Sequence, residues 1–276
     1  MKYYLETNAL RALGGNIGKN IELLKKSYTS IFSIFELIKG INRTKDSEKR
    51  LGILNSISDI DLQYIDLMPT EMAEMAFSDG ACISDSETIK KILSGDRLAQ
   101  DDYDKIIEKY ESSDKIFQKN VTIAYAIPAP PPKKITLTLD EIFPIESEAP
   151  DYLNSIPKDA HPSRFMMEFL KQTEVPELYR NLFPDSKIND QEILGKYNNS
   201  LNLFFFTSYA YDLKRRALRQ AASKNDLLDV LHTMYLIDEK SIIVTDDTML
   251  LSIIPPIYTM TVNEYRNMIE GTTVEN

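Results

Sequence analysis

The sequence predicts an α/β protein with three layers, α/β/α, around a central parallel sheet, interrupted by a largely helical insertion. Short β-prone runs alternate with helical patterns near both ends of the chain, which is typical of parallel sheets. Most of the 13 prolines lie between these two regions, and the hydrophobic content of 43% over 276 residues is enough for an ordinary core. We expect a core made of residues 1–80 and 201–276, with a mostly helical insertion at 81–200.

The composition excludes several other classes of protein. One cysteine forms no intrachain disulfide, and together with two histidines it does not provide the usual structural zinc sites. No window approaches the roughly 18 apolar residues of a membrane helix, and polar residues from Glu6 onward interrupt any secretory signal. We therefore expect a soluble, cytoplasmic protein that makes no use of a membrane.

The first eighty residues show a strand followed by several helices. The β-prone run 3–5 ends at a polar corner, and the apolar residues after it have helical spacing up to Gly14. The apolar segment 31–38 is a further helix, with Gly40 as its stop. Beyond these, we expect helices at 9–13, 20–26, 47–57 and 70–77, and a strand within 60–67.

The central region differs in composition. Helical patterns occur at 84–93, 101–117 and 162–172. Four prolines within 124–134 force an extended or polyproline conformation there. Pro184 interrupts the segment that follows the last of these helices, so we expect a loop at that point.

The last third returns to alternating helices and strands. We expect helices at 201–222, 225–237 and 248–253, and strands at 241–245 and 257–260. Ligands of open α/β sheets bind beyond the carboxyl ends of the strands, so the residues after each strand are of special interest.

Acidic residues stand at those positions. Glu6 follows the first strand, and Asp246 and Asp247 follow the strand at 241–245. Glu36 lies in an apolar helix, where an unpaired buried carboxylate would be unfavourable. Further along the chain, three side chains spaced three residues apart share one helix face: Asp226, Asp229 and His232.

Carboxylates gathered at one sheet edge repel one another. At about 6 Å and an effective dielectric near 20, each pair costs on the order of 3 kcal/mol. A divalent cation would neutralise them, and oxygen ligands favour Mg²⁺ or Mn²⁺ over zinc. Such a site can activate water for attack on a phosphate, which is nuclease chemistry.

A plainer interpretation also fits these acids. With 42 acidic residues, a strand end carries one by chance, and acids at helix starts are commonly N-caps. Asp226 is the best candidate for such a cap, and Asp246 with Asp247 fits a simple turn. Glu36 fits this interpretation least, because its neighbours on both sides are apolar.

Four segments in order resemble the motifs of PIN-domain ribonucleases. Residues 5–10, LETNAL, resemble the L-D-T-N-x-L opening of that family, and residues 30–40 resemble its S-x-x-x-x-x-E-L-x-x-G helix. Residues 229–233 and 243–247 are similar to its D-x-x-x-A helix and its closing T-x-D or T-x-N strand. The resemblance covers roughly the first 80 and the last 75 residues.

This resemblance implies a three-layer fold and metal-dependent cleavage of single-stranded RNA, often as the toxin of a toxin–antitoxin pair. The acids that would hold one or two cations are Glu6, Glu36, Asp229 and Asp247, with Asp226 and Asp246 as further candidate ligands. Asp229 fits the ungapped spacing of the motif, whereas Asp226 fits the helix start, so both stay open. Residues that would orient the ligands by hydrogen bonds are Thr7, Asn8, His232 and Thr245.

One position departs from the family pattern. Glu6 stands where these ribonucleases have Asp, and one extra methylene moves the carboxylate by about 1.5 Å. That shift is large for an ion with octahedral ligands at about 2.0–2.1 Å. A second hypothesis is therefore a catalytically silent PIN-like module that binds or regulates a partner protein.

An acidic protein that binds RNA must concentrate its positive charge, because phosphate contacts dominate the affinity. One candidate cluster follows the helix of Glu36 and includes Lys39 and Arg43. The other precedes Asp226 and is favoured because two tyrosines beside it offer stacking for bases; it comprises Lys214, Arg215, Arg216 and Arg219. Solvated helix faces are the plainer interpretation of both clusters.

A haloacid-type phosphatase has little support, because no D-x-D follows the first strand. The leading prediction is a Mg²⁺- or Mn²⁺-dependent ribonuclease. The RNA sequence it prefers, the number of metals, the presence of an antitoxin or another protein partner, and a monomeric or homo-oligomeric state stay open.

Overall fold

The computed structural model describes residues 1–41, 46–77, 89, 92–93, 100–113, 116, 162–217, 224–237 and 240–271. Five parallel strands form one sheet in the order β3-β2-β1-β4-β5. They are β1 (Lys2–Leu5), β2 (Ser27–Ser30), β3 (Gln63–Ile65), β4 (Ser241–Val244) and β5 (Thr259–Met260). The central strand thus comes from the N-terminus and pairs with a strand from the last 40 residues.

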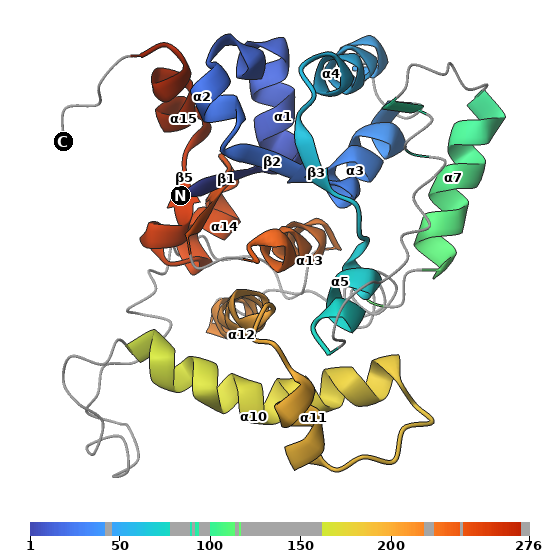
Figure 1. Ribbon diagram of the computed structural model, residues 1–276, viewed down its shortest axis with the longest axis vertical. Coiled ribbons are helices and arrows are strands. Elements are labelled where there is room, and N and C mark those ends of the chain that lie inside the picture. Colours follow the sequence, from blue (N-terminus) through green and yellow to red (C-terminus); the bar gives the residue numbers. More distant parts are fainter. Residues whose placement is uncertain are drawn as a thin grey trace.

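Helices cover both faces of this sheet (Figure 1). One face carries α1 (Thr7–Leu13), α2 (Ile21–Leu24), α4 (Ser47–Asp59) and α15 (Val262–Ile269), and the other carries α13 (Lys224–Leu231) and α14 (Thr248–Ile253). Helix α3 (Ile31–Ile41) continues directly from β2 and packs against α4. The predicted three-layer α/β/α class with a central parallel sheet is therefore confirmed.

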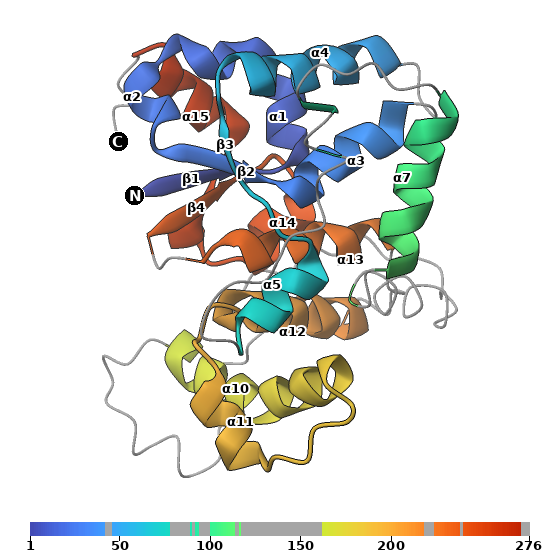
Figure 2. The ribbon, with the colours of Figure 1, turned by 45° about the vertical axis from the view of Figure 1, so that its right-hand side comes forward.

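Further helices lie outside these three layers (Figure 2). Helix α12 (Asn202–Ala217) packs on α13 and α14, and α10 (Pro162–Leu182) packs on its outer side with α11 (Asp190–Lys196). Helix α5 (Pro69–Met75) contacts α10, and α7 (Gln100–Ser113) lies against α3.

The chain leaves the core and returns to it at one place. The backbone N–H of Asn198 donates to the carbonyl of Ala76 at 3.0 Å, and the Asn198 side-chain amide donates to the carbonyl of Met75 at 3.2 Å. Residues more than 120 positions apart therefore lie side by side. Additional helices can be attached at such a point without disturbing the pairing of the strands.

The sheet is buried on both faces. Tyr4, Leu5, Ile243 and Val244 in the two central strands are fully buried, as near-continuous apolar strands of a parallel sheet require. Strand β2 is equally buried although its sequence is SYTS, because its hydroxyls are hydrogen-bonded. For example, the Thr29 hydroxyl donates to the Leu5 carbonyl at 2.8 Å.

Several element boundaries differ from those predicted. Helix α10 continues through Pro176 to residue 182 instead of ending at 172, and the strand expected within 60–67 is confined to β3. Helices α11 and α15 were not predicted, although capping boxes begin both, at Asn189 and at Thr261. The proline-rich segment 124–134 and most of 84–93 lie outside the described residues.

Within the part of the chain that the structure describes, no helix combines the length and the apolar character needed to cross a membrane.

The buried centre of β4 provides a test of the fold. We expect Ile243→Ala to lower the free energy of unfolding by about 2–5 kcal/mol, because it opens a cavity in the core beside the central strands. As a matched control, Ile257→Ala at a side chain that is 70% exposed changes it by less than about 0.5 kcal/mol. Urea denaturation of both variants measures the difference, and equal effects would contradict this sheet arrangement.

Candidate functional site

Acidic side chains meet at the carboxyl edge of the sheet. Glu6 directly follows β1, and the segment 245–247 directly follows the paired strand β4. Glu36 lies in α3 beyond the end of β2, and Asp229 comes from α13. The charges of Glu36, Asp247 and Glu6 all act on Asp229, so the four predicted acids form one electrostatically coupled group.

The Glu6 side chain is buried and folds back on its own helix. Its carboxylate accepts hydrogen bonds from the backbone N–H of Asn8 at 2.6 Å and of Ala9 at 3.3 Å, and so caps α1. Burial raises the pKa of Glu6 to about 7, with a contribution from the charge of Glu36, although these hydrogen bonds and His232 lower it.

Glu36 is held by two neighbours at one oxygen. Its Oε2 accepts a hydrogen bond from the Thr7 hydroxyl and lies 2.9 Å from Nε2 of His232. Burial alone would raise the pKa of Glu36, but His232, Thr7 and Lys39 outweigh it, so this pKa is lowered. Glu36 therefore stays ionised more readily than Glu6 or Asp229, whose pKa values are raised.

The pKa of Asp229 is raised further than that of Glu6. Burial raises its pKa to about 8, and the charges of Glu36, Asp247 and Glu6 add to this shift while His232 opposes it. Asp226, one turn earlier, accepts a hydrogen bond from the Tyr211 hydroxyl at 3.3 Å. This coupling favours Asp229 over Asp226 as the third acid.

The acids after β4 have separate roles. Asp247 caps α14 by accepting a hydrogen bond from the N–H of Leu250 at 2.8 Å, and its own N–H donates to the Thr245 hydroxyl at 2.9 Å. Asp246 instead accepts from the N–H of Val262 at 2.9 Å, at the start of α15. Asp246 therefore binds the start of α15. The charge of Asp247, by contrast, acts on Asp229.

The remaining polar candidates divide in the same way. Thr7 bonds to Glu36, and the hydroxyl of the buried Thr245 also contributes a hydrogen bond that lowers the pKa of Glu6. Asn8 is exposed, and within the described ranges its side chain makes no hydrogen bond, while its backbone N–H donates to the Glu6 carboxylate. Thr7 and Thr245 thus touch the acids directly through their side chains.

The donor atoms suit a hard cation, but they do not form a ready ligand set. Among the described residues, no three His, Cys, Asp or Glu side chains are grouped so that they would hold a metal ion as they stand. The physical reason is that the carboxylates of Glu6 and Asp247 each turn toward helix N–H groups, and Glu36 is held through one oxygen. Carboxylate oxygens are the ligands that Mg²⁺ and Mn²⁺ prefer, and a cation would displace the protons of Glu6 and Asp229.

A chain of buried polar groups leads away from Glu36. The second ring nitrogen of His232, Nδ1, lies 2.8 Å from the Tyr4 hydroxyl, which lies 2.8 Å from the Ser30 hydroxyl and 3.1 Å from that of Ser33. Burial would lower the pKa of His232, but Glu36 and the other acids outweigh it, so the pKa is raised. Tyr4, Ser30 and Ser33 are not among the residues predicted for the site. The feature that could have indicated them is a polar side chain within an apolar segment.

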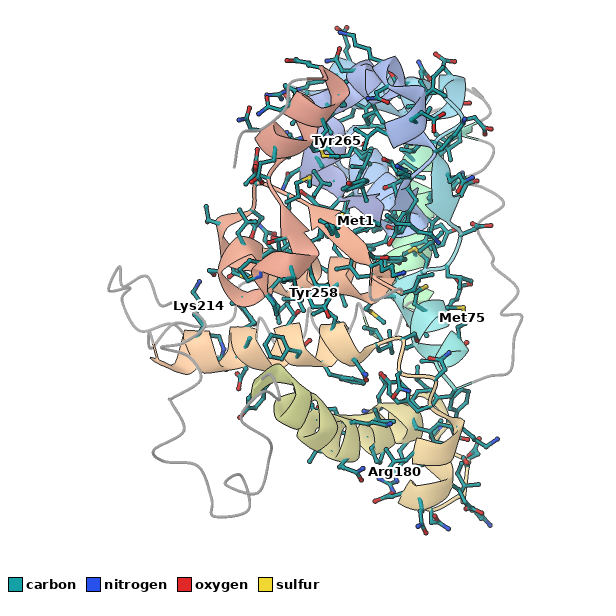
Figure 3. The ribbon with its side chains drawn as sticks, turned by 60° about the vertical axis from the view of Figure 1, so that its left-hand side comes forward. Met1, Met75, Arg180, Lys214, Tyr258 and Tyr265 are labelled. Carbon is teal, nitrogen blue, oxygen red and sulfur yellow. The ribbon has the colours of Figure 1, made fainter. Side chains whose placement is uncertain are left out.

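The basic candidates are only partly available for RNA. Lys39 forms an ion pair with Glu111 of α7, and Arg215 forms one with Asp212 at 2.5 Å. Lys214 reaches Ser252 of α14, on the side of α12 that faces the sheet (Figure 3). Arg43 and Arg219 lie outside the described residues, and only the helical backbone of Arg216 is described.

Lys214 is the basic residue placed beside the acids. Burial lowers the pKa of its ammonium group, whereas the charges of Asp226 and Asp247 raise it. The lowering is the net result, and the amine is half-buried. Lys214 therefore provides a positive charge near Asp226 and Asp247.

A hollow lined by lysines lies at the opposite edge of the sheet. It has a volume of about 170 Å³ and includes Lys2, Lys25 and Lys26 in its lining. A four-residue strand spans about 13 Å, so this hollow lies away from the acids that follow the strands. It is not part of the acidic site.

Comparison of the chain with protein-family models, with curated proteins and with solved structures found no match.

The raised pKa values predict how stability depends on pH. Glu6 and Asp229 have ordinary pKa values of 4.5 and 3.8, raised to about 7 and about 8 by folding. Between these limits the folded state binds more protons than the unfolded state, so stability falls as pH rises. His232, with a pKa raised above 6.5, contributes with the same sign at the upper end of this range. In EDTA we expect the melting temperature to fall by several degrees between pH 5 and pH 8.

A pair of variants attributes this slope to the acids. Asp229→Asn should flatten the pH dependence, because the neutral amide has no proton to lose. Asp226→Asn, one turn away on the same helix, should leave it unchanged. A melting temperature that is constant or rises between pH 5 and pH 8 would contradict the coupled arrangement of the four acids.

Proposed function

We propose that the protein is a divalent-cation-dependent nuclease that cleaves RNA, with Glu6, Glu36, Asp229 and Asp247 as the acids of its site. The observation that carries this proposal is the meeting of four acids from both ends of the chain at the carboxyl edge of a parallel sheet. Ligands bind at this edge in open α/β folds. Its electrostatics supports a cation, since burial and mutual repulsion raise the pKa values of Glu6 and Asp229.

A Mg²⁺ or Mn²⁺ ion at this edge would supply positive charge and lower the pKa of a bound water, which suits phosphodiester hydrolysis. Within the chain, Thr7 fixes the Glu36 carboxylate, and Asp229 and Glu6 supply oxygens once they lose their protons. Lys214 would supply positive charge for a phosphate group near Asp226 and Asp247. These residues bind and orient the substrate and hold negative charge at a fixed point.

RNA as the substrate, and single-stranded RNA in particular, is supported by the resemblance to PIN-domain ribonucleases. The same resemblance supports an antitoxin or another protein as partner. We place the protein in the cytoplasm, where a chain with one cysteine needs no oxidising compartment. The strand order brings the four resembling segments to one edge, which is the arrangement that this proposal requires.

A second candidate function is a catalytically silent module that binds a protein partner. The capping role of Glu6 favours it, because the carboxylate is already engaged by two N–H groups of α1. The contact between His232 and Glu36 favours it as well, because a protonated imidazole would neutralise charge without a metal. The two candidates differ in one measurable property, cation-dependent cleavage.

Cleavage of single-stranded RNA tests the proposal. We expect the purified protein to cleave a labelled oligoribonucleotide in Mn²⁺ and to stop in EDTA. Glu36→Gln should reduce the rate by at least about 100-fold, since loss of an outer partner of a metal ligand alone costs 10–100-fold. The rate is measured by gel electrophoresis under single-turnover conditions.

Glu111→Gln provides a matched control, because it changes a glutamate of α7 that pairs with Lys39 and does not belong to the acid group. It should retain activity within about threefold. Cleavage that persists in EDTA and in Glu36→Gln would show a contaminating nuclease. Intact RNA under all conditions, with no rise in melting temperature on addition of Mn²⁺, would favour the silent module.

A further inference from the structure

The buried chain from Ser30 and Ser33 through Tyr4 and His232 ends on a carboxylate oxygen of Glu36. Tyr4 and His232 come from opposite ends of the sequence, 228 positions apart, and both are fully buried. Every member of the chain is within hydrogen-bond distance of the next, between 2.8 and 3.1 Å. Buried polar groups are paired in this way because an unpaired one is costly.

The chemistry of Glu36 fixes one of these hydrogen bonds. An ionised carboxylate only accepts, so Nε2 of His232 must carry the hydrogen that faces Glu36. Nδ1 hydrogen-bonds to the Tyr4 hydroxyl, as acceptor in the neutral imidazole and as donor in the protonated one, and the same hydroxyl hydrogen-bonds to those of Ser30 and Ser33. The N–H of Ser33 donates to the Ser30 hydroxyl at 3.1 Å and anchors this series of hydrogen bonds at the start of α3.

This arrangement constrains Glu36. Oε2 receives both the Thr7 hydroxyl and the imidazole, whereas Oε1 makes no hydrogen bond within the part of the chain that the structure describes. Without the Tyr4 hydroxyl, Nδ1 of His232 loses its hydrogen-bond partner, and the ring is held only at Nε2 and by packing. Aromatic contacts with Tyr4 and Phe32 pack the ring, but they do not distinguish its two nitrogens.

We propose that Tyr4 is a positioning residue which, through His232, holds Oε2 of Glu36 and leaves Oε1 as the oxygen available to a cation. This inference builds on the proposed nuclease function, because it assigns the orientation of one of its acids. It predicts that a single hydroxyl, buried away from any substrate, controls cation affinity. Partners of this kind in metal proteins change affinity by about 10–100-fold when they are removed.

Tyr4→Phe tests this proposal with Tyr28→Phe as its matched control. Both tyrosines are buried, they lie opposite each other in neighbouring strands, and each hydroxyl bonds within the core. The Tyr28 hydroxyl donates instead to the Tyr235 carbonyl at 2.8 Å. A purely structural role would lower the melting temperature of both variants alike.

Two readouts separate positioning from stability. The first is the ¹⁵N spectrum of the imidazoles without metal, where His161→Gln assigns the signals because the chain has two histidines. We expect His232 to carry its hydrogen on Nε2 in the wild type, with the Nδ1 signal changed in Tyr4→Phe and unchanged in Tyr28→Phe. The second is calorimetric Mn²⁺ affinity, which should fall about tenfold in Tyr4→Phe and less than twofold in Tyr28→Phe.

Each outcome decides the question. A wild-type His232 with a bare Nε2, or a Tyr4→Phe variant with unchanged imidazole signals and Mn²⁺ affinity, would overturn the proposal. If Tyr4→Phe does not fold, His232→Gln should keep most of the Mn²⁺ affinity through its amide N–H and His232→Leu should lose it; equal affinities would overturn the proposal. If the wild type binds no Mn²⁺, the nuclease proposal fails, and the imidazole spectra alone decide whether Tyr4 orients His232.

Discussion

The pairing of β1 with β4 is the constraint on which the rest of the structure depends. It aligns Leu5 with Val244, so the residues that follow both strands must leave the sheet at the same edge. Glu6 and Asp247 are thereby brought to the same edge although 241 positions separate them. The buried apolar side chains of the two strands stabilise this register, since a slip by one residue would turn them to the other face. The concentration of negative charge is thus a consequence of core packing.

A cation at the proposed site would compete with helix capping for the same carboxylates. Glu6 caps α1 and Asp247 caps α14, and a carboxylate at a helix N-terminus is stabilised by the N–H groups and by the helix dipole. In Asp247 one oxygen faces Leu250. In Glu6 both oxygens face the backbone of α1. The two acids therefore differ in how much must change before a cation is bound, and Glu6 must change most.

The sequence predicted the architecture well because its strongest signals are local. Apolar runs in β4 and helical spacing in α4 and α14 follow directly from burial, and the alternation of elements implies parallel pairing. Strand β2 escaped this logic, since SYTS is polar and only its hydrogen bonds in the folded chain make it a buried strand. The acids Glu6, Glu36, Asp229 and Asp247 were chosen as candidates because they follow strands or interrupt apolar helices, and their function stays a prediction. Tyr4 was not chosen, since its partners Ser30 and His232 are distant in sequence, and no local pattern shows that their side chains meet.

The Glu6 carboxylate caps α1, and a cation at the proposed site would have to accommodate this role. In the observed state the Glu6 carboxylate satisfies the N–H groups of Asn8 and Ala9, and an unsatisfied buried N–H costs about 1–3 kcal/mol. Burial nevertheless raises its pKa to about 7, so near neutral pH about half of the molecules carry a neutral carboxyl at this cap. A cation that recruits Glu6 must displace this proton and leave the two N–H groups without their acceptor. If a cation binds at this edge as proposed, a water molecule between it and Glu6 would avoid the second cost, because the carboxylate would stay on α1 while its charge still acted on the ion. Glu6 is therefore compatible with the proposed cation site without leaving its position at the start of α1.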